Sequence, residues 1–188
     1  MTIQKQRPVD LDSRMIRIID ALGGESEYIT IADLATKMGT SRRQMEYDLT
    51  KLNNIFSTLE MPLIDTKQNT GIKLEHANFF WFGEVFRDGQ KKVKFVYRKK
   101  ERIALIIVHI IIGGASYRNE DFCKYLGVSR TTIFSDMKGV KTIIEDYGAS
   151  LQYDYYYKYY IKATGIQYSR LLKKSARELF KNIPTKSI

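Results

Sequence analysis

The fold of this chain is decided by a pattern that occurs twice. Residues 38–49 read MGTSRRQMEYDL, and residues 126–137, which lie 88 positions later, read LGVSRTTIFSDM. Each stretch has an apolar residue followed by glycine, then a serine two positions later, and then apolar residues at helical spacing. Glycine can adopt the positive φ of a tight turn, and serine is a preferred residue before the first turn of a helix. The pattern is typical of the turn and second helix of a helix-turn-helix motif.

The repeat extends in both directions at the same spacing and without a gap. Upstream, the aligned apolar pairs are Met15 with Ile103, Ile18 with Ile106, Ile19 with Ile107 and Leu22 with Ile110. Downstream, the aligned pairs are Met45 with Ile133, Asp48 with Asp136, Leu49 with Met137, Leu52 with Val140 and Ile55 with Ile143. An internal repeat of this length marks a repeated structural unit. Two copies of one unit, at about 13–76 and 101–165, therefore organise the chain.

Each copy predicts three helices followed by two β-strands. The helices are expected at about 12–22, 31–38 and 42–56, and again at about 101–112, 119–126 and 130–146. A glycine pair follows each first helix, Gly23-Gly24 or Gly113-Gly114, and we expect it to end that helix in a left-handed conformation. Strands are expected around 63–65 and 71–74, and around 150–153 and 159–161. Three helices closed by a β-hairpin form a winged helix-turn-helix, so the predicted fold class is mainly α with small β-hairpins (α+β).

This reading divides the chain into four parts. We expect a first winged helix-turn-helix domain over 1–76, an aromatic and basic linker over 77–100, a second winged helix-turn-helix domain over 101–165, and a basic amphipathic helix over 166–188. The linker holds an aromatic cluster, 79–86, that is expected to pack between the units or to form a dimer contact. The apolar face of the last helix is expected to comprise Tyr168, Leu171, Leu172, Leu179 and Phe180.

The first turn of each third helix carries the candidate DNA-binding residues, because in a helix-turn-helix this turn faces base edges and phosphates. In the first copy they are Ser41, Arg42, Arg43, Gln44 and Tyr47, and in the second they are Ser129, Arg130, Thr131, Thr132 and Ser135. Arginine can bind guanine and glutamine can bind adenine through two hydrogen bonds. The shorter hydroxyl side chains suit phosphates or thymine methyl groups. The alternative is that these residues are only the solvated faces of small helical domains.

Local spacing gives further expectations for these helices. Ser41 and Ser129 are predicted N-caps, and Ser41 with Gln44 matches the spacing of a capping box. Asp48 and Asp136 lie at equivalent positions in the two copies. A carboxylate on a DNA-facing helix would repel phosphate, so we expect each aspartate to have a structural role through an arginine or backbone contact.

The second wing is rich in tyrosine. Six of the 13 tyrosines lie between Tyr153 and Tyr160. Alternating tyrosines suit a strand with one packed face, but they could also contact sugar-phosphate or stack on bases. Lys158, in the same wing, is predicted to contact a phosphate.

The net charge of +10 lies mostly outside the helix-turn-helix motifs. Residues 13–76 carry a net −1 and residues 103–165 a net +1, whereas residues 89–102 carry +6 and residues 166–188 carry +5. A basic chain, here with a pI near 9.5, suggests a polyanionic partner. The residues expected to contact the DNA backbone from the linker are Lys91, Lys92, Lys94 and Arg98.

Several other classes of protein are disfavoured. One cysteine, Cys123, forms no internal disulfide and points to the reducing cytoplasm. The most hydrophobic run, 103–112, is about half the length of a membrane-spanning helix, so no membrane partner is expected. His76 and His109 lack further ligands at metal-binding spacing, so neither a metal nor another cofactor is predicted. No nucleophile–base arrangement is present, so we do not expect an enzyme.

The second copy resembles a segment of certain bacterial regulators. The resemblance rests on residues 100–102, on 126–133 with Asp136, on Tyr147-Gly148 and on Tyr159-Tyr160, while residues 29–48 carry it in the first copy. These stretches are similar to the tandem helix-turn-helix region of regulators that bear phosphotransferase-system regulation domains (PRD), the mannitol- and lichenan-type activators, and of Mga-type virulence regulators. The resemblance covers 12–165, and it departs at Tyr159, where the second wing of the family has glycine.

That resemblance implies a cytoplasmic bacterial transcription regulator that binds double-stranded DNA, with a regulatory domain downstream of residue 188. The chain is then a DNA-binding half or a short regulator. A homodimer would recognise a pseudo-palindrome. Two alternatives remain open: a plasmid or phage replication initiator with tandem winged helices, and a winged-helix module that binds proteins.

Overall fold

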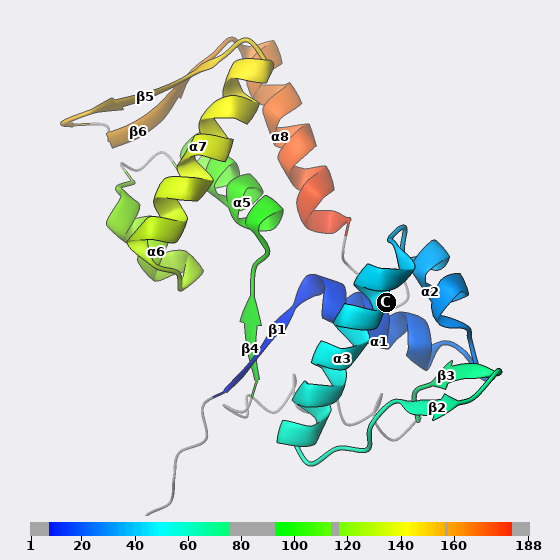
Figure 1. Cartoon of the computed structure of the whole chain (residues 1–188). Helices are drawn as coiled ribbons and strands as arrows, with labels where there is room; N and C mark the ends of the chain where they lie inside the picture. The colour runs from blue at the N-terminus through cyan, green and yellow to red at the C-terminus, as the bar shows by residue number, and fades with distance from the viewer. Residues whose placement is uncertain (1–7, 76–92, 114–116, 157, 182–188) are drawn as a thin grey trace, which may run out of the picture. The chain divides into compact units, whose positions relative to one another are not determined.

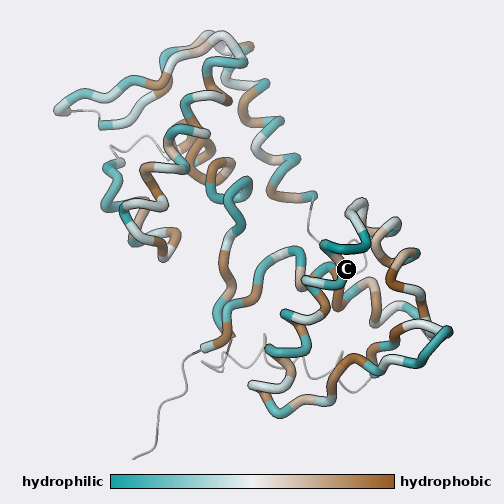
Figure 2. The backbone as a smooth tube through the Cα atoms, in the orientation of Figure 1, coloured by the Kyte–Doolittle hydropathy of each residue, from teal (hydrophilic) through white to brown (hydrophobic). Residues whose placement is uncertain are grey.

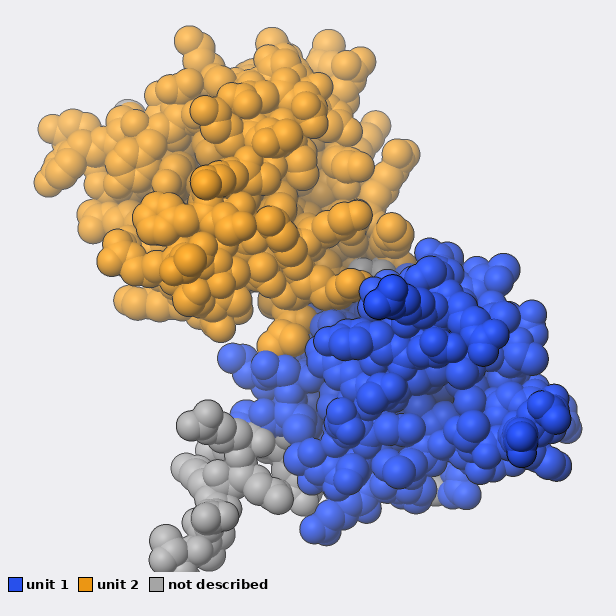
Figure 3. Space-filling model, viewed as in Figure 1, with its two compact units in different colours: residues 1–95, 184–188 blue, residues 96–183 orange. Residues whose placement is uncertain are grey.

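The computed structural model describes residues 8–75, 93–113, 117–156 and 158–181. The chain divides into two compact units, residues 1–95 with 184–188 and residues 96–183 (Figure 3). The boundary falls within the predicted linker, of which residues 77–92, including the aromatic cluster, lie outside the described part. Each unit is described below by itself.

Over residues 8–75 and 93–95, the first unit contains three helices and two pairs of short strands (Figure 1). Its elements are β1 (Val9–Asp12), α1 (Ser13–Gly23), α2 (Ile31–Lys37), α3 (Arg42–Thr58), β2 (Asp65–Lys67), β3 (Gly71–Lys73) and β4 (Val93–Val96), whose last residue crosses the boundary. Strand β1 pairs with β4, and β2 pairs with β3 as an antiparallel hairpin in which Thr66 faces Ile72. Hydrophobic residues alternate with hydrophilic ones along α3, as expected for a helix with one buried face (Figure 2).

The helix-turn-helix of this unit has the predicted local geometry. Gly39 has a φ of +62°, which glycine adopts without steric cost. Ser41 caps α3 by accepting a hydrogen bond of 3.2 Å from the Gln44 N–H. The predicted capping box is incomplete, however, because the Gln44 side chain donates to Asp48 at 3.0 Å and does not return to the cap.

Ile29, which lies between α1 and α2, adds a single β-bridge to the β2–β3 hairpin, and the sequence did not indicate this bridge. Ile29 pairs with Ile72 of β3 through two backbone hydrogen bonds of 3.0 and 2.9 Å. A side chain at Gly71 would place its Cβ 2.3 Å from the Ile29 carbonyl oxygen, and Gly71 has a φ of +134°. Glycine is therefore required where the first wing crosses this β-bridge.

The described residues of the second unit repeat the three helices and the hairpin, and helix α8 follows the hairpin. Its elements are α5 (Lys99–Ile112), α6 (Asn119–Leu126), α7 (Arg130–Asp146), β5 (Ser150–Asp154), β6 (Lys158–Lys162) and α8 (Gly165–Phe180). Gly127 has a φ of +64°, Ser129 caps α7, and Tyr117 pairs with Tyr159 as Ile29 pairs with Ile72. Helix α8 packs against α5 within this unit. Its predicted apolar face is confirmed at Leu171, which is buried, but Phe180 at its end is exposed.

The second wing forms its hairpin although it lacks the expected glycine. Strands β5 and β6 pair with Leu151 opposite Ile161, and the positive φ that glycine supplies in the first wing is found at Lys158, with a φ of +55°. The position equivalent to Gly71 is thus Lys158, which lies 87 residues later. Equivalent residues of the helices lie 88 residues apart, so the second wing is one residue shorter up to this point. Tyr159 is half-buried and forms a β-bridge with Tyr117.

The left-handed conformation predicted for the glycine pairs is wrong at Gly24 and at Gly113. Gly24 and Gly113 have φ values of −82° and −70°, and each N–H continues the helical hydrogen bonding, to Asp20 and His109 respectively. Gly113 is instead explained by close approach, because a Cβ there would lie 2.7 Å from the Tyr117 ring. Gly114 lies outside the described residues.

The same buried ion pair fastens the first helix to the third helix in both units. Arg14 Nε lies 2.5 Å from Asp48, and Arg102 Nε lies 2.6 Å from Asp136, whose side chain is 1% exposed. Arg102 lies 88 residues after Arg14, and Asp136 lies 88 residues after Asp48, so the ion pair belongs to the repeat. Both aspartates therefore have the structural role expected of them, with an arginine from another helix as the partner.

Each unit has its own hydrophobic core, built from the inward faces of its three repeated helices and its wing. The first core includes Ile18, Leu34, Leu52 and Phe56, and the second includes Ile106, Phe122, Val140 and Leu171. The predicted α+β class with tandem winged helices is thus confirmed. Among the residues that the structure describes, no helix is long and apolar enough to cross a membrane.

Candidate nucleic-acid interface

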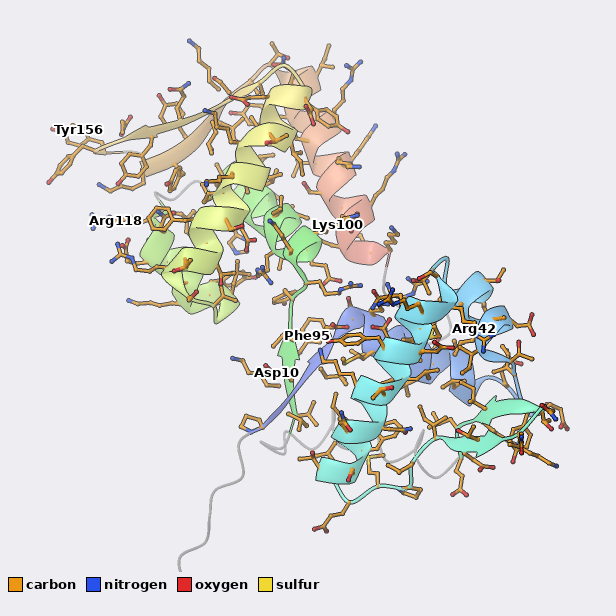
Figure 4. The ribbon with its side chains drawn as sticks, in the orientation of Figure 1. Asp10, Arg42, Phe95, Lys100, Arg118 and Tyr156 are labelled. Carbon is orange, nitrogen blue, oxygen red and sulfur yellow. The ribbon has the colours of Figure 1, made fainter. Side chains whose placement is uncertain are left out.

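Helices α3 and α7 present equivalent first turns, because each follows a left-handed glycine and a serine cap. Their inward faces are held by the buried apolar stripe and by the Arg–Asp pair, so the outward faces are set by the fold. Ser41 and Ser129 are exposed at the two caps. Arg42, labelled in Figure 4, lies at the start of α3.

The first turn of α3 presents basic and amide groups. Arg42 forms an exposed ion pair of 2.9 Å with Glu46 one turn along. Arg43 is exposed and has no hydrogen-bond or ion-pair partner within the described part of the chain. Tyr47 is 66% exposed, while the Gln44 amide is held by Asp48. Arg43 is therefore the side chain of this turn that is most available to a ligand.

The first turn of α7 presents shorter polar groups. Arg130 forms an exposed ion pair of 2.7 Å with Glu120 of α6. Thr131 is exposed, and Thr132 shares a hydrogen bond of 2.9 Å with Ser129. Ser135 accepts a hydrogen bond of 3.2 Å from Lys99 at the start of α5. Exposed ion pairs of this kind contribute little stability, so Arg130 can leave Glu120 for another anion.

An exposed phenylalanine on α7 was not predicted from the sequence. Phe134 is 53% exposed and lies one turn after Arg130, in the position that Glu46 occupies on α3. An apolar side chain in this place could contact a thymine methyl group. Its spacing of four residues from both Arg130 and Lys138 was the available signal, because it puts Phe134 on the outward face.

The first wing carries two lysines, Lys67 and Lys73, that were not predicted as site residues. Tyr28 donates a hydrogen bond to Asp65 of β2, and this bond, followed by burial, raises the pKa of the Tyr28 hydroxyl. The ammonium groups of Lys67 and Lys73 each lie 5.8 Å from the centre of the Tyr28 ring. The two lysines therefore share one aromatic ring at the edge of the first hairpin.

The second wing is aromatic where the first is basic. Lys158 is buried, donates to the Tyr155 carbonyl oxygen, and lies 4.5 Å from the centre of the Tyr155 ring. Its ammonium group is thus engaged within the hairpin. Tyr155 and Tyr156 are 79% and 80% exposed, and Figure 4 shows Tyr156 at the tip. Of the described wing tyrosines, Tyr159 packs against the core, so the expectation of one packed face is met only in part.

The remaining residues that the sequence analysis singled out lie outside the first turns of α3 and α7. Lys94 is exposed on β4, and the exposed Arg98 caps α5, with its N–H donating to Glu101 at 2.9 Å. Lys91, Lys92 and His76 lie outside the described residues. His109 packs against the rings of Tyr117 and Tyr125 at 5.7 and 4.2 Å between ring centres. Within the described ranges, no group of histidine, cysteine or carboxylate side chains is placed to hold a metal ion.

Comparison with known proteins gives little further information. No protein-family model matches the chain, and no curated protein matches its sequence. One solved structure that it is similar to is ScpB from Mycobacterium tuberculosis, at 13% identity, with 87% of this chain and 98% of that chain covered and a TM-score of 0.30. A likeness at that level carries no inference about function.

Proposed function

We propose that this protein is a sequence-specific, double-stranded-DNA-binding transcription regulator of bacteria, of the PRD or Mga-like kind, with α3 and α7 as its recognition helices. The observation that supports it best is the duplicated element itself. Two helices with exposed polar first turns follow the same left-handed turn and serine cap, 88 residues apart. Such a helix fits the major groove, which is wide enough to admit it.

The two recognition helices would supply different chemistry. On α3, Arg43 is available for two hydrogen bonds to guanine, and Tyr47 is exposed one turn along. On α7, Thr131 and Phe134 favour a thymine methyl, while Arg130 can exchange Glu120 for a phosphate or a base. The two DNA segments contacted by α3 and α7 would therefore differ in base sequence. A homodimer would place two such pairs in a pseudo-palindrome, which the stoichiometry of the complex would test.

The test of this function is selection of bound fragments from genomic DNA, followed by footprinting. We expect a selected fragment to bind at least ~10³-fold more tightly than bulk DNA at the same salt concentration, as specific regulators do. The footprint is expected to lie in promoters. A chain that binds the selected fragment no better than bulk DNA would contradict the proposal. A footprint confined to a replication origin would identify a replication initiator instead.

A second candidate function is a protein-interaction module, and the exposed aromatic residues of the second unit favour it. Phe134, Tyr155 and Tyr156 are all more than half exposed, and aromatic residues are enriched in protein interfaces. This function predicts weak duplex binding with no preference for any fragment. Measuring duplex affinity across a series of salt concentrations separates the two functions, because phosphate contacts make affinity fall steeply with salt.

A further inference from the structure

Helix α8 has one face buried in the second unit. Thr164 caps it, accepting from the Gln167 N–H while the Gln167 side chain accepts from the Thr164 N–H at 2.7 Å. Leu171 and Ser175 are buried and Leu179 is half-buried, so the face that includes 171, 175 and 179 is the inward one. The helix packs against α5 with this face.

The opposite face of α8 is a stripe of positive charge. Its members are exposed and recur at helical spacing, so that they fall within about 100° of arc. We call them the α8 basic stripe, and they are Arg170, Lys173, Lys174, Arg177 and Lys181. Glu178 is the sole acidic residue of α8. None of the five has an ion-pair partner in the described part of the chain.

Such a stripe weakens the helix that carries it. Like charges four residues apart on a helix, such as Arg170 with Lys174 and Lys173 with Arg177, repel one another and oppose helix formation. The helix-turn-helix motifs do not account for this charge, because their net charges are close to zero while residues 166–188 carry +5. A partner that supplies a row of negative charges would remove the repulsion.

The shape of the stripe suits a linear polyanion. From Arg170 to Lys181 the helix rises about 16 Å. One strand of duplex DNA presents a phosphate every ~3.4 Å of axis, which gives about five phosphates over that length. A small anion would use only one or two of the five cations. The C-terminal half of α8 also lies on the side of the unit away from the tip of the second wing (Figure 1).

We propose that the α8 basic stripe binds the phosphate backbone of duplex DNA that flanks the segment contacted by α7, on the side away from the second wing. This inference rests on the DNA-binding function proposed above. It assigns to α8 an affinity role, while α3 and α7 select the sequence. Backbone contacts of this kind position a protein without reading bases.

The test compares two triple variants of the full chain. The first, Arg170→Gln/Lys174→Gln/Arg177→Gln, removes three charges, and the matched control, Arg170→Lys/Lys174→Arg/Arg177→Lys, keeps them. Affinity for the selected fragment and for bulk DNA is measured from 50 to 300 mM salt. The neutral variant is expected to lower the slope of log affinity against log salt by about 2.7 and to leave the ratio between the two DNAs unchanged. The control is expected to keep the wild-type slope.

The outcomes separate the two proposals. If the wild-type chain prefers no fragment, the proposed function fails. If the wild type binds selectively and the neutral variant keeps its slope and its footprint, the α8 proposal alone is overturned, and this result would point to an acidic protein as the partner of the stripe. Folding is checked by the urea midpoint, which should be unchanged or higher in the neutral variant because repulsion along α8 is relieved.

Discussion

Arg43 is the residue whose removal most directly probes base recognition. It is exposed at the first turn of α3 and has no partner in the described structure. Arg43→Ala is expected to cost about 1–3 kcal/mol of binding free energy and to relax selectivity at one base position. Lys51→Ala, which removes an exposed charge further along α3, serves as the control in fragment competition assays. An equal loss on every sequence would mean that Arg43 touches only phosphate.

The buried ion pairs predict where stability is most sensitive to a single residue. Asp136 accepts from Arg102 at 2.6 and 3.2 Å and is fully buried. Asp136→Asn leaves Arg102 without its counter-charge, so we expect a loss of about 3–5 kcal/mol in the free energy of unfolding. Asp48→Asn should cost less, since Arg14 and Asp48 are more exposed.

Urea unfolding of the full chain checks this prediction. Asp146→Asn, which changes an exposed aspartate at the end of the same helix, is the control and should change the free energy of unfolding by less than about 0.5 kcal/mol. Equal midpoints for the Asp136 and Asp146 variants would show that the buried pair does not fasten α5 to α7.

At the scale of elements, three glycines predict an order of stability changes. Gly165→Ala should be nearly neutral, because no atom lies within 4 Å of the added Cβ and its φ is not positive. Gly39→Ala should cost about 1 kcal/mol, from its φ of +62° alone. Gly71→Ala should cost more, because its Cβ would also lie 2.3 Å from the Ile29 carbonyl oxygen. Urea midpoints in any other order would contradict the turn and wing geometry.

The elements differ in how far the sequence could predict them. Helices α3 and α7 were predictable because their apolar spacing extends over several turns and their caps recur 88 residues apart. The pairing of Ile29 with Ile72 was not, because one residue pair has no periodicity. The left-handed conformation predicted at Gly24 and Gly113 was wrong, because a glycine can serve close packing, as Gly113 does beside Tyr117, as well as a left-handed turn.

The sequence predicted where the candidate site residues lie, but it did not predict which side chains they contact. The first turns of α3 and α7 are exposed, as their place in the motif requires. The contacts of Gln44 with Asp48 and of Arg130 with Glu120 depend on side-chain directions that spacing alone does not give. Lys158 was predicted to contact a phosphate, yet the hairpin turns its ammonium group onto Tyr155.

At the scale of the whole molecule, the proposed recognition helices and most of the net positive charge lie in different segments of the chain. The two helix-turn-helix motifs are nearly neutral, and much of the net charge of +10 lies in residues 89–102 and 166–188. We therefore expect selectivity and affinity to be separable by mutation: variants in α3 or α7 should change which fragments are bound, and variants in α8 should change how strongly salt weakens all of them.

The central claim is that both recognition helices read duplex sequence, and selection from a random duplex library tests it most directly. The wild type is predicted to select two neighbouring blocks of preferred bases, Arg43→Ala to lose preference in one block, and Arg130→Ala to lose preference in the other. No preferred sequence for the wild type, or the same preferences for all three proteins, would contradict the claim.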